Sequence, residues 1–190
     1  STLFPYTTLF RSSLPEKFVL KCNHDSASTI ICKDKNRFNF TAAEAKLSKA
    51  LKYDYYHDMG KQWAYKGIKR CIIAEPLLEI EGTSELIDYK FMVFNGECKC
   101  ILASSERFSR TGTKMDFYDC DWNLFPFTRH YPNSKNGIPR PSNLELMISL
   151  SEKIAHYIGN PFIRVDFYDV NQKVYFGETT FYPGGGFSEF

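Results

Sequence analysis

The stretch FIRVDFYDVNQKVYFGETTFYPGGG, residues 162–186, places β-branched and aromatic residues on both sides of a polar pair at 171–172. This pattern predicts two antiparallel strands joined by a tight turn. Because side chains alternate between the two faces of a strand, Arg164 and Asp166 share one face. Glu178 on the second strand then lies almost opposite Asp166, to within one residue of register.

Two carboxylates that face each other across a hairpin repel unless a positive charge lies between them. A hard divalent cation such as Mg²⁺, shared with phosphate oxygens, would supply that charge. Arg164 would then face the same phosphates. The alternative is a solvated sheet face on which Arg164, Asp166 and Glu178 simply point at water. The residues of this stretch leave both interpretations open.

The composition is that of a globular protein with a surplus of aromatic residues. Of 190 residues, 43% are hydrophobic and 16% are aromatic, which is enough to form a core. The net charge of +2 gives no electrostatic reason to expect binding to nucleic acid or to an anionic membrane. No apolar run approaches the ~20 residues that a membrane-spanning helix needs. We therefore expect neither a nucleic-acid partner nor a membrane span.

The six cysteines are scattered along the chain and form no CxxC pair. This spacing argues against a zinc site and against a disulfide framework. We interpret the cysteines as buried, reduced thiols of a cytoplasmic protein.

The first twelve residues, STLFPYTTLFRS, look like the translation of a sequencing-library adapter and not like a targeting signal. We therefore expect residues 1–12 to be an artefact that contributes nothing to the fold. The biological chain would begin near Ser13, with further sequence missing upstream.

The segment 14–34 predicts two short strands around a small polar loop, 23–29. Lys21 lies at the end of the first strand, directly before this loop. Such an arrangement suits a phosphate-binding flap, which offers backbone N–H groups and one ammonium group to an anion. The alternative is an ordinary hairpin loop, in which His24 is a structural hydrogen-bonding residue.

Two capping boxes predict where helices begin. They are Thr41-x-x-Glu44 and Ser142-x-x-Glu145, each followed by apolar residues at helical spacing. Gly159 is expected to end the second helix in a left-handed conformation.

Two further signals concern the sheets. The pair Asn95-Gly96 lies between β-rich arms and predicts a type I′ hairpin turn. Pro76 cannot donate a hydrogen bond to a ladder, so the chain is expected to leave its sheet after Glu75. The predicted subdomains are therefore 13–74 and 75–190.

The triplet Asp119-Cys120-Asp121 matches the short DxD pattern with which many glycosyltransferases hold a metal and a nucleotide-sugar diphosphate. Aspartate is also common at turn positions, and Trp122 follows directly. The triplet therefore leaves a second enzymatic hypothesis, in which Asp119 and Asp121 bind a sugar nucleotide.

Several segments follow one another in an order that is typical of a known family. They are LPEKFVLKCNHDSAS (14–28), CIIAEPLLE (71–79), IDYKFMVFNGE (87–97), DFYDCDWN (116–123), HYPNSKNGIPRPSNLE (130–145) and RVDFYDVNQKVYFGETTFYPGGGF (164–187). In these segments the chain resembles the TupA-like ATP-grasp family, named for a protein of teichuronopeptide synthesis. The resemblance covers essentially all of residues 13–190.

The resemblance implies an α+β fold of the ATP-grasp type, in which two subdomains with antiparallel sheets enclose a nucleotide cleft. It also implies an ATP- and Mg²⁺-dependent ligase that joins a carboxylate to an amine through an acylphosphate. The substrate would be a small molecule or a polysaccharide precursor, in cell-surface polysaccharide or teichuronopeptide-type biosynthesis. Such a transfer needs charge neutralisation more than covalent catalysis. The alternatives are the glycosyltransferase above and a truncated, inactive nucleotide-binding module.

The resemblance further implies a role for individual residues. The candidates for nucleotide binding are Lys21, the flap residues His24, Ser26 and Ser28, and the hinge residues Glu75, Leu77 and Leu78. The basic candidates for catalysis are Lys90, Arg107 and Arg164. The candidate metal ligands are Asp166, Glu178 and Thr180. The chain departs from the family pattern at Ala27, where the flap usually has a more permissive glycine, and at Thr180, where many ATP-grasp proteins have asparagine.

Overall fold

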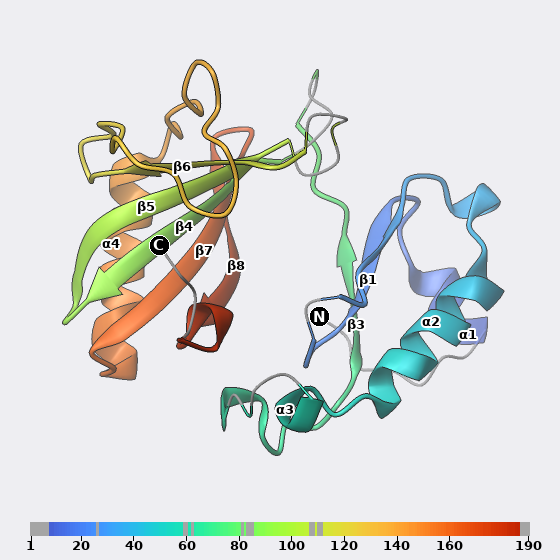
Figure 1. Cartoon of the computed structure of the whole chain (residues 1–190). Coiled ribbons are helices and arrows are strands. Elements are labelled where there is room, and N and C mark those ends of the chain that lie inside the picture. Colours follow the sequence, from blue (N-terminus) through green and yellow to red (C-terminus); the bar gives the residue numbers. More distant parts are fainter. Residues whose placement is uncertain are drawn as a thin grey trace. The chain divides into compact units, whose positions relative to one another are not determined.

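The computed structural model describes residues 8–25, 27–58, 61, 63–80, 82, 86–106, 109 and 112–186. The chain divides into two compact units, Ser1–Leu77 and Leu78–Phe190. The division lies at Leu77/Leu78, three residues after the predicted boundary between residues 74 and 75. Each unit combines helices with an antiparallel sheet (Figure 1). Among the described helices, none combines the length and apolar character that crossing a membrane requires.

The first unit is built on a three-stranded antiparallel sheet of order β2-β1-β3. Its strands are β1 (Phe18–Cys22), β2 (Ile30–Cys32) and β3 (Ile72–Pro76). Its helical elements are α1 (Thr8–Ser13), η1 (Lys35–Arg37), α2 (Phe40–Lys52), α3 (Tyr55–Asp58) and η2 (Trp63–Tyr65). Phe18, Leu20 and Cys22 point to one face of β1 and form a core with Leu47 of α2. The opposite face of β1 carries Val19 and Lys21.

The second unit is built on a five-stranded antiparallel sheet of order β6-β5-β4-β7-β8. Its strands are β4 (Asp88–Phe94), β5 (Glu97–Ser105), β6 (Lys114–Tyr118), β7 (Phe162–Val170) and β8 (Lys173–Thr180). Helix α4 (Leu144–Ile158) covers one face, and the short η3 (Pro183–Gly186) follows β8 (Figure 1). Phe91, Val165 and Met147 belong to the buried core between α4 and the sheet.

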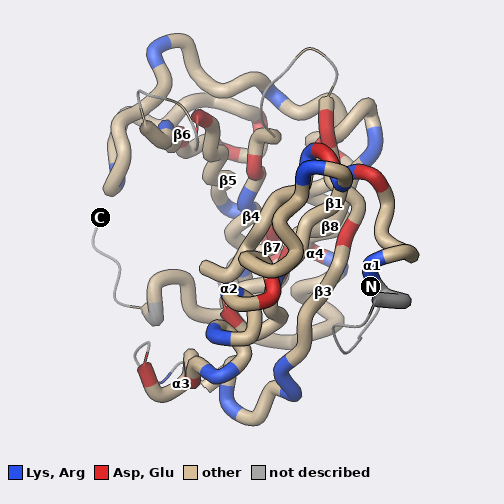
Figure 2. The backbone as a smooth tube through the Cα atoms, turned by 90° about the vertical axis from the view of Figure 1, so that its right-hand side faces the viewer, with Lys and Arg blue, Asp and Glu red and all other residues tan. Residues whose placement is uncertain are grey.

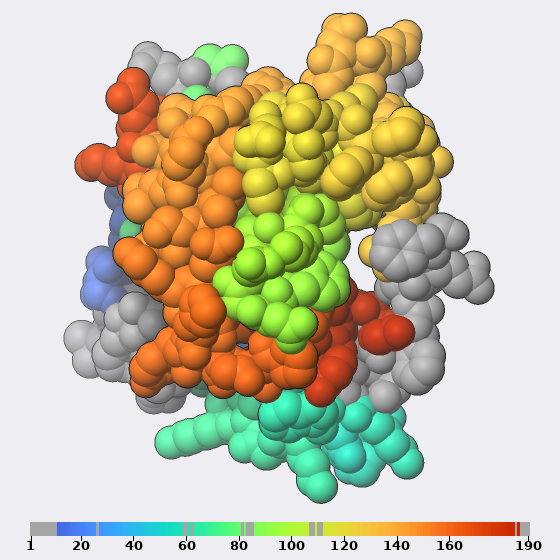
Figure 3. All heavy atoms as spheres, turned by 90° about the vertical axis from the view of Figure 1, so that its left-hand side faces the viewer, coloured from blue at the N-terminus to red at the C-terminus, as the bar shows by residue number. Residues whose placement is uncertain are grey.

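The predicted hairpin turns are confirmed. Asn95 and Gly96 have φ values of 48° and 84° and join β4 to β5, and Asn171 and Gln172, at 51° and 62°, join β7 to β8. In Figure 3 the end of the β4–β5 hairpin, in green, lies beside α4, in orange. Gly159 ends α4 at a φ of 75°, as the sequence predicts.

Both predicted capping boxes are wrong. Helix α2 has its N-cap at Asn39, two residues before Thr41, because the side chain of Asn39 accepts a hydrogen bond from the N–H of Ala42. Helix α4 has Asn143 at its N-cap, without a side-chain capping bond. The hydroxyl of Ser142 donates instead to Asp169 of β7, at 2.7 Å. A different residue thus caps α2, and the residue expected to cap α4 has its partner on β7.

The described end of the segment 1–12 contacts the rest of the first unit. The guanidinium of Arg11 donates to Glu44 at 3.1 Å and lies over the ring of Phe40. The ammonium of Lys35 donates to the carbonyl of Ser12 at 3.4 Å. Residues 11 and 12, which the sequence analysis set aside, therefore pack against α2 and η1.

Candidate functional site: a row of charges on the helix-free sheet face

A row of charged side chains crosses the face of the five-stranded sheet that α4 does not cover. Lys90 of β4 is the register partner of Asp166 on β7, and Asp166 is the register partner of Glu178 on β8. Partners on neighbouring strands point to the same face, so the three side chains lie side by side. Asp88, two residues before Lys90, shares that face. The neighbouring residues Tyr89 and Phe91 point the other way, into the core under α4, together with Val165 and Phe167.

The side chains of this row form a continuous network. The Lys90 ammonium donates to Asp88 Oδ2 at 2.5 Å and to Asp166 Oδ2 at 2.6 Å. Arg164 Nε donates to Asp166 Oδ1, and Arg164 Nη2 donates to both Asp166 Oδ2 and Glu178 Oε1, each at 2.7 Å. The Arg164 guanidinium therefore lies between the two carboxylates, in the position that the sequence argument gave to a metal ion.

The members of the network differ in how far their side chains are buried. The side chains of Lys90, Asp88 and Asp166 are 9%, 5% and 3% exposed, whereas that of Glu178 is 62% exposed. Lys90, Asp88 and Asp166 are therefore not part of a solvated sheet face, which was the alternative interpretation. Burial on its own lowers the pKa of Arg164, but the hydrogen bonds and charge of Asp166, with Glu178 and Asp88, outweigh it and leave that pKa raised. Arg164 is a permanent cation of this site.

A β-bulge at Gly177 decides which face Glu178 occupies. Next to the turn, Val170 pairs with Lys173 and Phe167 with Phe176; continued unchanged, this register would pair Asp166 with Gly177. The register shifts by one residue between Asp166 and Phe167, so Asp166 pairs with Glu178 instead. A one-residue slip moves a side chain to the other face of a sheet. Without the bulge, Glu178 would pair with Val165 and point toward the core under α4.

Filling the bulge should therefore disturb both the fold and the site. A Cβ at position 177 would lie 3.0 Å from the backbone oxygen of Asp166 and 3.3 Å from Tyr168 Cε2. We expect Gly177→Val to cost about 1–3 kcal/mol of stability in urea unfolding, as overpacking does, and Gly177→Ala to cost less. Wild-type stability of Gly177→Val would show that the bulge tolerates a side chain and does not hold the register.

The structure brings together two of the predicted nucleotide-binding residues in the first unit. Lys21 Nζ and Glu75 Oε2 form an ion pair at 2.8 Å, with side chains 33% and 43% exposed. Both lie on the face of the β2-β1-β3 sheet that α2 leaves uncovered. An ion pair this exposed contributes only about 0–1 kcal/mol. Lys21 can therefore exchange Glu75 for an anionic ligand at little cost.

The loop predicted as a phosphate flap is tied to its own aspartate. Asp25 Oδ1 accepts hydrogen bonds from the N–H groups of Ala27 and Ser28, at 3.2 and 3.0 Å, and from the Ser28 hydroxyl at 2.6 Å. Ser28 Oγ in turn accepts from the N–H of Cys22 at 2.7 Å. The N–H groups that the sequence argument offered to a phosphate donate here to a carboxylate. Ser26 lies outside the described residues, as does the candidate Arg107.

His24 is buried and faces the end of α2. Its Nε2 lies 3.2 Å from the carbonyl oxygen of Ala50 and 3.3 Å from that of Tyr53. The last carbonyls of a helix lack partners within the helix, so the His24 ring acts as a C-terminal cap. This geometry agrees with the structural interpretation of His24, and its contact with a nucleotide stays a prediction.

The remaining hinge candidates lie at the division between the two units. The N–H of Leu77 donates to the carbonyl oxygen of Lys17 at 3.2 Å, which ties the residue after β3 to the residue before β1. Leu78 is the first residue of the second unit. A role of these residues in binding adenine stays a prediction.

The triplet at 119–121 forms a turn. Asp119 Oδ1 accepts from the N–H groups of Asp121 and Asn123, at 2.9 and 2.8 Å, and Asp119 Oδ2 accepts from the Asn123 amide at 2.9 Å. The Asn123 side-chain bond, with these backbone bonds, lowers the pKa of Asp119. Trp122 stacks on Tyr118 with 4.0 Å between ring centroids. The interpretation as a turn is confirmed, and the turn uses the carboxylate that a sugar nucleotide would need.

The donor set on the sheet face is compatible with a magnesium ion that also binds phosphates. Within the described part of the chain, no three His, Cys, Asp or Glu side chains come together as a metal site would need. Mg²⁺ is usually held by one or two carboxylates together with substrate phosphates and water. The row contains the three carboxylates of Asp88, Asp166 and Glu178 but only two cations, so it has one negative charge in excess. Thr180 Oγ1 donates to Glu178 Oε1 at 3.3 Å, and Glu178 is exposed enough to turn toward a ligand. The residues therefore fit the ion that the sequence predicts.

The sequence profile of the TupA-like ATP-grasp family matches residues 6–190. The chain belongs to the TupA-like ATP-grasp family. The match includes the described end of the segment that was expected to be an artefact. No curated protein matches the chain.

Solved structures of ATP-grasp ligases resemble this TupA-like chain at low sequence identity. The D-alanine–D-alanine ligase of Bacillus anthracis complexed with ATP has a TM-score of 0.50 and 12% identity, and the match covers 93% of this chain and 44% of that one. The D-alanine–D-alanine ligase of Helicobacter pylori has a TM-score of 0.48 and 15% identity, over 97% and 49% of the two chains. The ATP-grasp ligase PsnB with its minimal precursor has a TM-score of 0.48 and 9% identity, over 95% and 44%.

The likeness to the B. anthracis structure and the family match confirm the predicted α+β fold with two antiparallel sheets. The chain spans less than half of the length of these ligases. A nucleotide cleft between the subdomains stays a prediction.

Sequence reasoning missed two features of the site. One is the buried partnership of Asp88 with Lys90, although their i, i+2 spacing on a strand already placed both on one face. The other is the bulge at Gly177. Its signal in the sequence was a glycine inside a β-rich stretch, directly before Glu178, whose predicted register with Asp166 was uncertain by one residue.

Proposed function

We propose that this chain is the ATP-binding part of a ligase that joins a carboxylate to an amine through an acylphosphate. The observation that carries the proposal is the row Lys90–Asp166–Glu178 with Arg164, on the helix-free face of the five-stranded sheet. Family membership supports ATP as the nucleotide. It also supports a small-molecule or polysaccharide-precursor substrate, in cell-surface polysaccharide or teichuronopeptide-type biosynthesis.

The chemistry that this row offers is electrostatic. A carboxylate is a poor electrophile, and its phosphorylation creates a good leaving group for attack by an amine. The transferring phosphoryl group carries negative charge on its oxygens and is stabilised by fixed cations. Lys90 and Arg164 are held by Asp88 and Asp166, so both cations are positioned before a ligand arrives.

Glu178, Asp166 and Thr180 are the residues that would hold magnesium. A bound Mg²⁺ would neutralise phosphate charge and orient the triphosphate. Among the three, Glu178 is the most accessible, and its Oε1 is the atom that contacts Arg164 and Thr180. We infer that Arg164 releases Glu178 when phosphates offer the guanidinium a new partner.

Lys21 would contribute a further ammonium to the phosphates from the first unit, in exchange for Glu75. We also propose a cytoplasmic location, which the six free thiols support, since free thiols persist in reducing compartments.

A thermal-shift titration tests the nucleotide. ATP with Mg²⁺, at a concentration about 100-fold above its dissociation constant, should raise the melting temperature by roughly 5–10 °C. UDP and UDP-sugars should raise it far less. A response to UDP-sugars that exceeds the response to ATP would overturn the proposal in favour of a glycosyltransferase. Binding of Mg–ATP without release of ADP, for any carboxylate and amine supplied, would identify an inactive nucleotide-binding module.

A further inference from the structure

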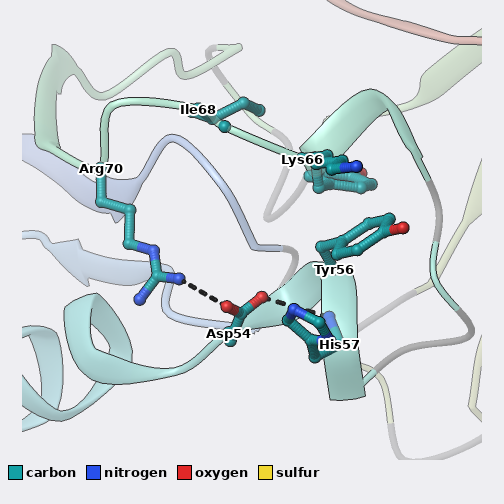
Figure 4. Close-up of a pocket in the computed structure, with 8 residues that line it drawn as sticks. Asp54, Tyr56, His57, Lys66, Ile68 and Arg70 are labelled. Atoms are coloured by element: carbon teal, nitrogen blue, oxygen red, sulfur yellow. Dashed lines mark hydrogen bonds and ion pairs between the residues drawn. The ribbon is translucent and has the colours of Figure 1, made fainter.

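A pocket in the first unit is lined by described residues that are not members of the charged row. It has a volume of about 300 Å³ and is lined by residues of 54–57 and 65–70. Figure 4 shows Arg70 on one side and Tyr56, His57 and Lys66 on the other, with Asp54 between them. Ligand pockets in proteins range over roughly 300–1,000 Å³. This volume is at the lower end of that range and suits a ligand about the size of one sugar ring.

The charges of the pocket favour an anion. Arg70 is held in place, because its guanidinium pairs with Asp54 at 3.1 Å and donates to the carbonyl oxygen of Leu51 at 3.2 Å. The ammonium of Lys66 lies 5.6 Å from the centroid of the Tyr56 ring, and among the described residues it has no carboxylate partner. The lining contains two cations, Lys66 and Arg70, and one carboxylate, Asp54, so it has one positive charge in excess. Figure 2 shows acidic and basic residues interspersed along the backbone, so this excess is a local feature.

The aromatic residues favour a ligand with a ring. Tyr56 and Tyr65 both line the pocket, and Tyr65 packs against Tyr55 with 4.6 Å between ring centroids. As lining residues, the two tyrosines present aromatic surface to the pocket, against which a cyclic molecule can pack.

The remaining polar group favours hydroxyl groups on that ring. Asp54 Oδ1 accepts from the N–H of His57 at 3.1 Å, and Asp54 Oδ2 pairs with Arg70. A carboxylate has about four acceptor positions, so it can accept further hydrogen bonds from a ligand. A ligand that carries hydroxyl donors uses these positions, whereas a purely aromatic acid cannot.

We propose that this pocket binds a small anionic sugar, that is, a single sugar ring with a carboxylate or a phosphate group. The negative group pairs with Lys66, the ring lies against Tyr56 and Tyr65, and the ring hydroxyls donate to Asp54. The described residues that line the site belong to the first unit, and the proposal does not depend on the ligase activity proposed above.

Heteronuclear NMR of the whole ¹⁵N-labelled chain tests the proposal. The probes are glucuronate and glucose 6-phosphate, with glucose and inorganic phosphate as comparisons, all at constant ionic strength. We expect one or both anionic sugars to shift amide signals of residues 54–58 and 63–70, and their relative affinity to distinguish a carboxylate from a phosphate. Lys66→Ala should weaken that binding about tenfold, the loss of one charge-assisted hydrogen bond. Lys69→Ala, an exposed lysine outside the pocket, should leave it unchanged.

Four results would overturn the proposal: no shifts at the pocket, equal binding of neutral glucose, equal binding of inorganic phosphate, or an affinity that Lys66→Ala does not change. The response of Lys66→Ala to Mg–ATP is measured in parallel and should equal that of the unmodified chain. This second measurement separates a failure of the pocket from a failure of the nucleotide site.

Discussion

Replacing Lys90 by methionine is expected to destabilise the second unit by about 3–5 kcal/mol, the usual cost of removing one partner from a buried ion pair. The Lys90 ammonium contacts Asp88 at 2.5 Å and Asp166 at 2.6 Å, and all three side chains are buried. Without it, two carboxylates remain in a poorly solvated environment and lose the cation between them. Methionine keeps most of the side-chain volume, so the expected loss is electrostatic and not a cavity effect. Urea unfolding followed by circular dichroism measures it.

Two further variants decide whether charge is the cause. Lys99→Met removes a lysine of β5 that is 58% exposed and paired with Glu97 of the same strand, and it should change stability by less than about 0.5 kcal/mol. Asp88→Asn combined with Lys90→Met should recover part of the loss, because the double variant no longer buries the Asp88 charge. If Lys90→Met costs no more than Lys99→Met, the network contributes little to the fold.

Local signals predicted the strands and turns of the charged row. The pairs Asn95-Gly96 and Asn171-Gln172 adopt positive φ values between β-rich arms, and both features depend on a few adjacent residues. The alternation of side chains along a strand then placed Arg164 and Asp166 on one face. For these reasons the sequence was sufficient to locate the hairpin and its acids.

Features that depend on distant partners could not be predicted. The capping box at Ser142 is not formed because Asp169, on a strand 27 residues away, accepts the hydroxyl. His24 lies in a polar loop of the sequence, yet its ring reaches the end of α2. The cation between Asp166 and Glu178 is Arg164, because a guanidinium on the same strand can contact both carboxylates at once. In each case the side chain could be identified from the sequence, but the residue that it contacts in the fold could not.

Glu178→Gln is expected to lower the Mg²⁺-dependent part of ATP affinity by about 10–100-fold, the typical effect of disturbing a metal site. The fold should remain intact, because the Glu178 side chain is 62% exposed and its ion pair with Arg164 is at the edge of the network. Calorimetric titration of ATP in the presence of Mg²⁺, and again with the metal chelated, measures the two affinities. Glu97→Gln makes the same change on an exposed glutamate of β5 and should alter neither.

The comparison of the two titrations separates two roles for Glu178. If the carboxylate holds magnesium, the substitution weakens ATP binding with Mg²⁺ and leaves the metal-free affinity nearly unchanged. If Glu178 only restrains Arg164, its loss frees the guanidinium for phosphates, and ATP binds equally or more tightly in both titrations. Asp166→Asn does not make this distinction so cleanly, because Asp166 is buried and holds both Arg164 and Lys90, so its loss also costs stability. Glu178 is the acid at which the metal hypothesis can fail without the fold failing first.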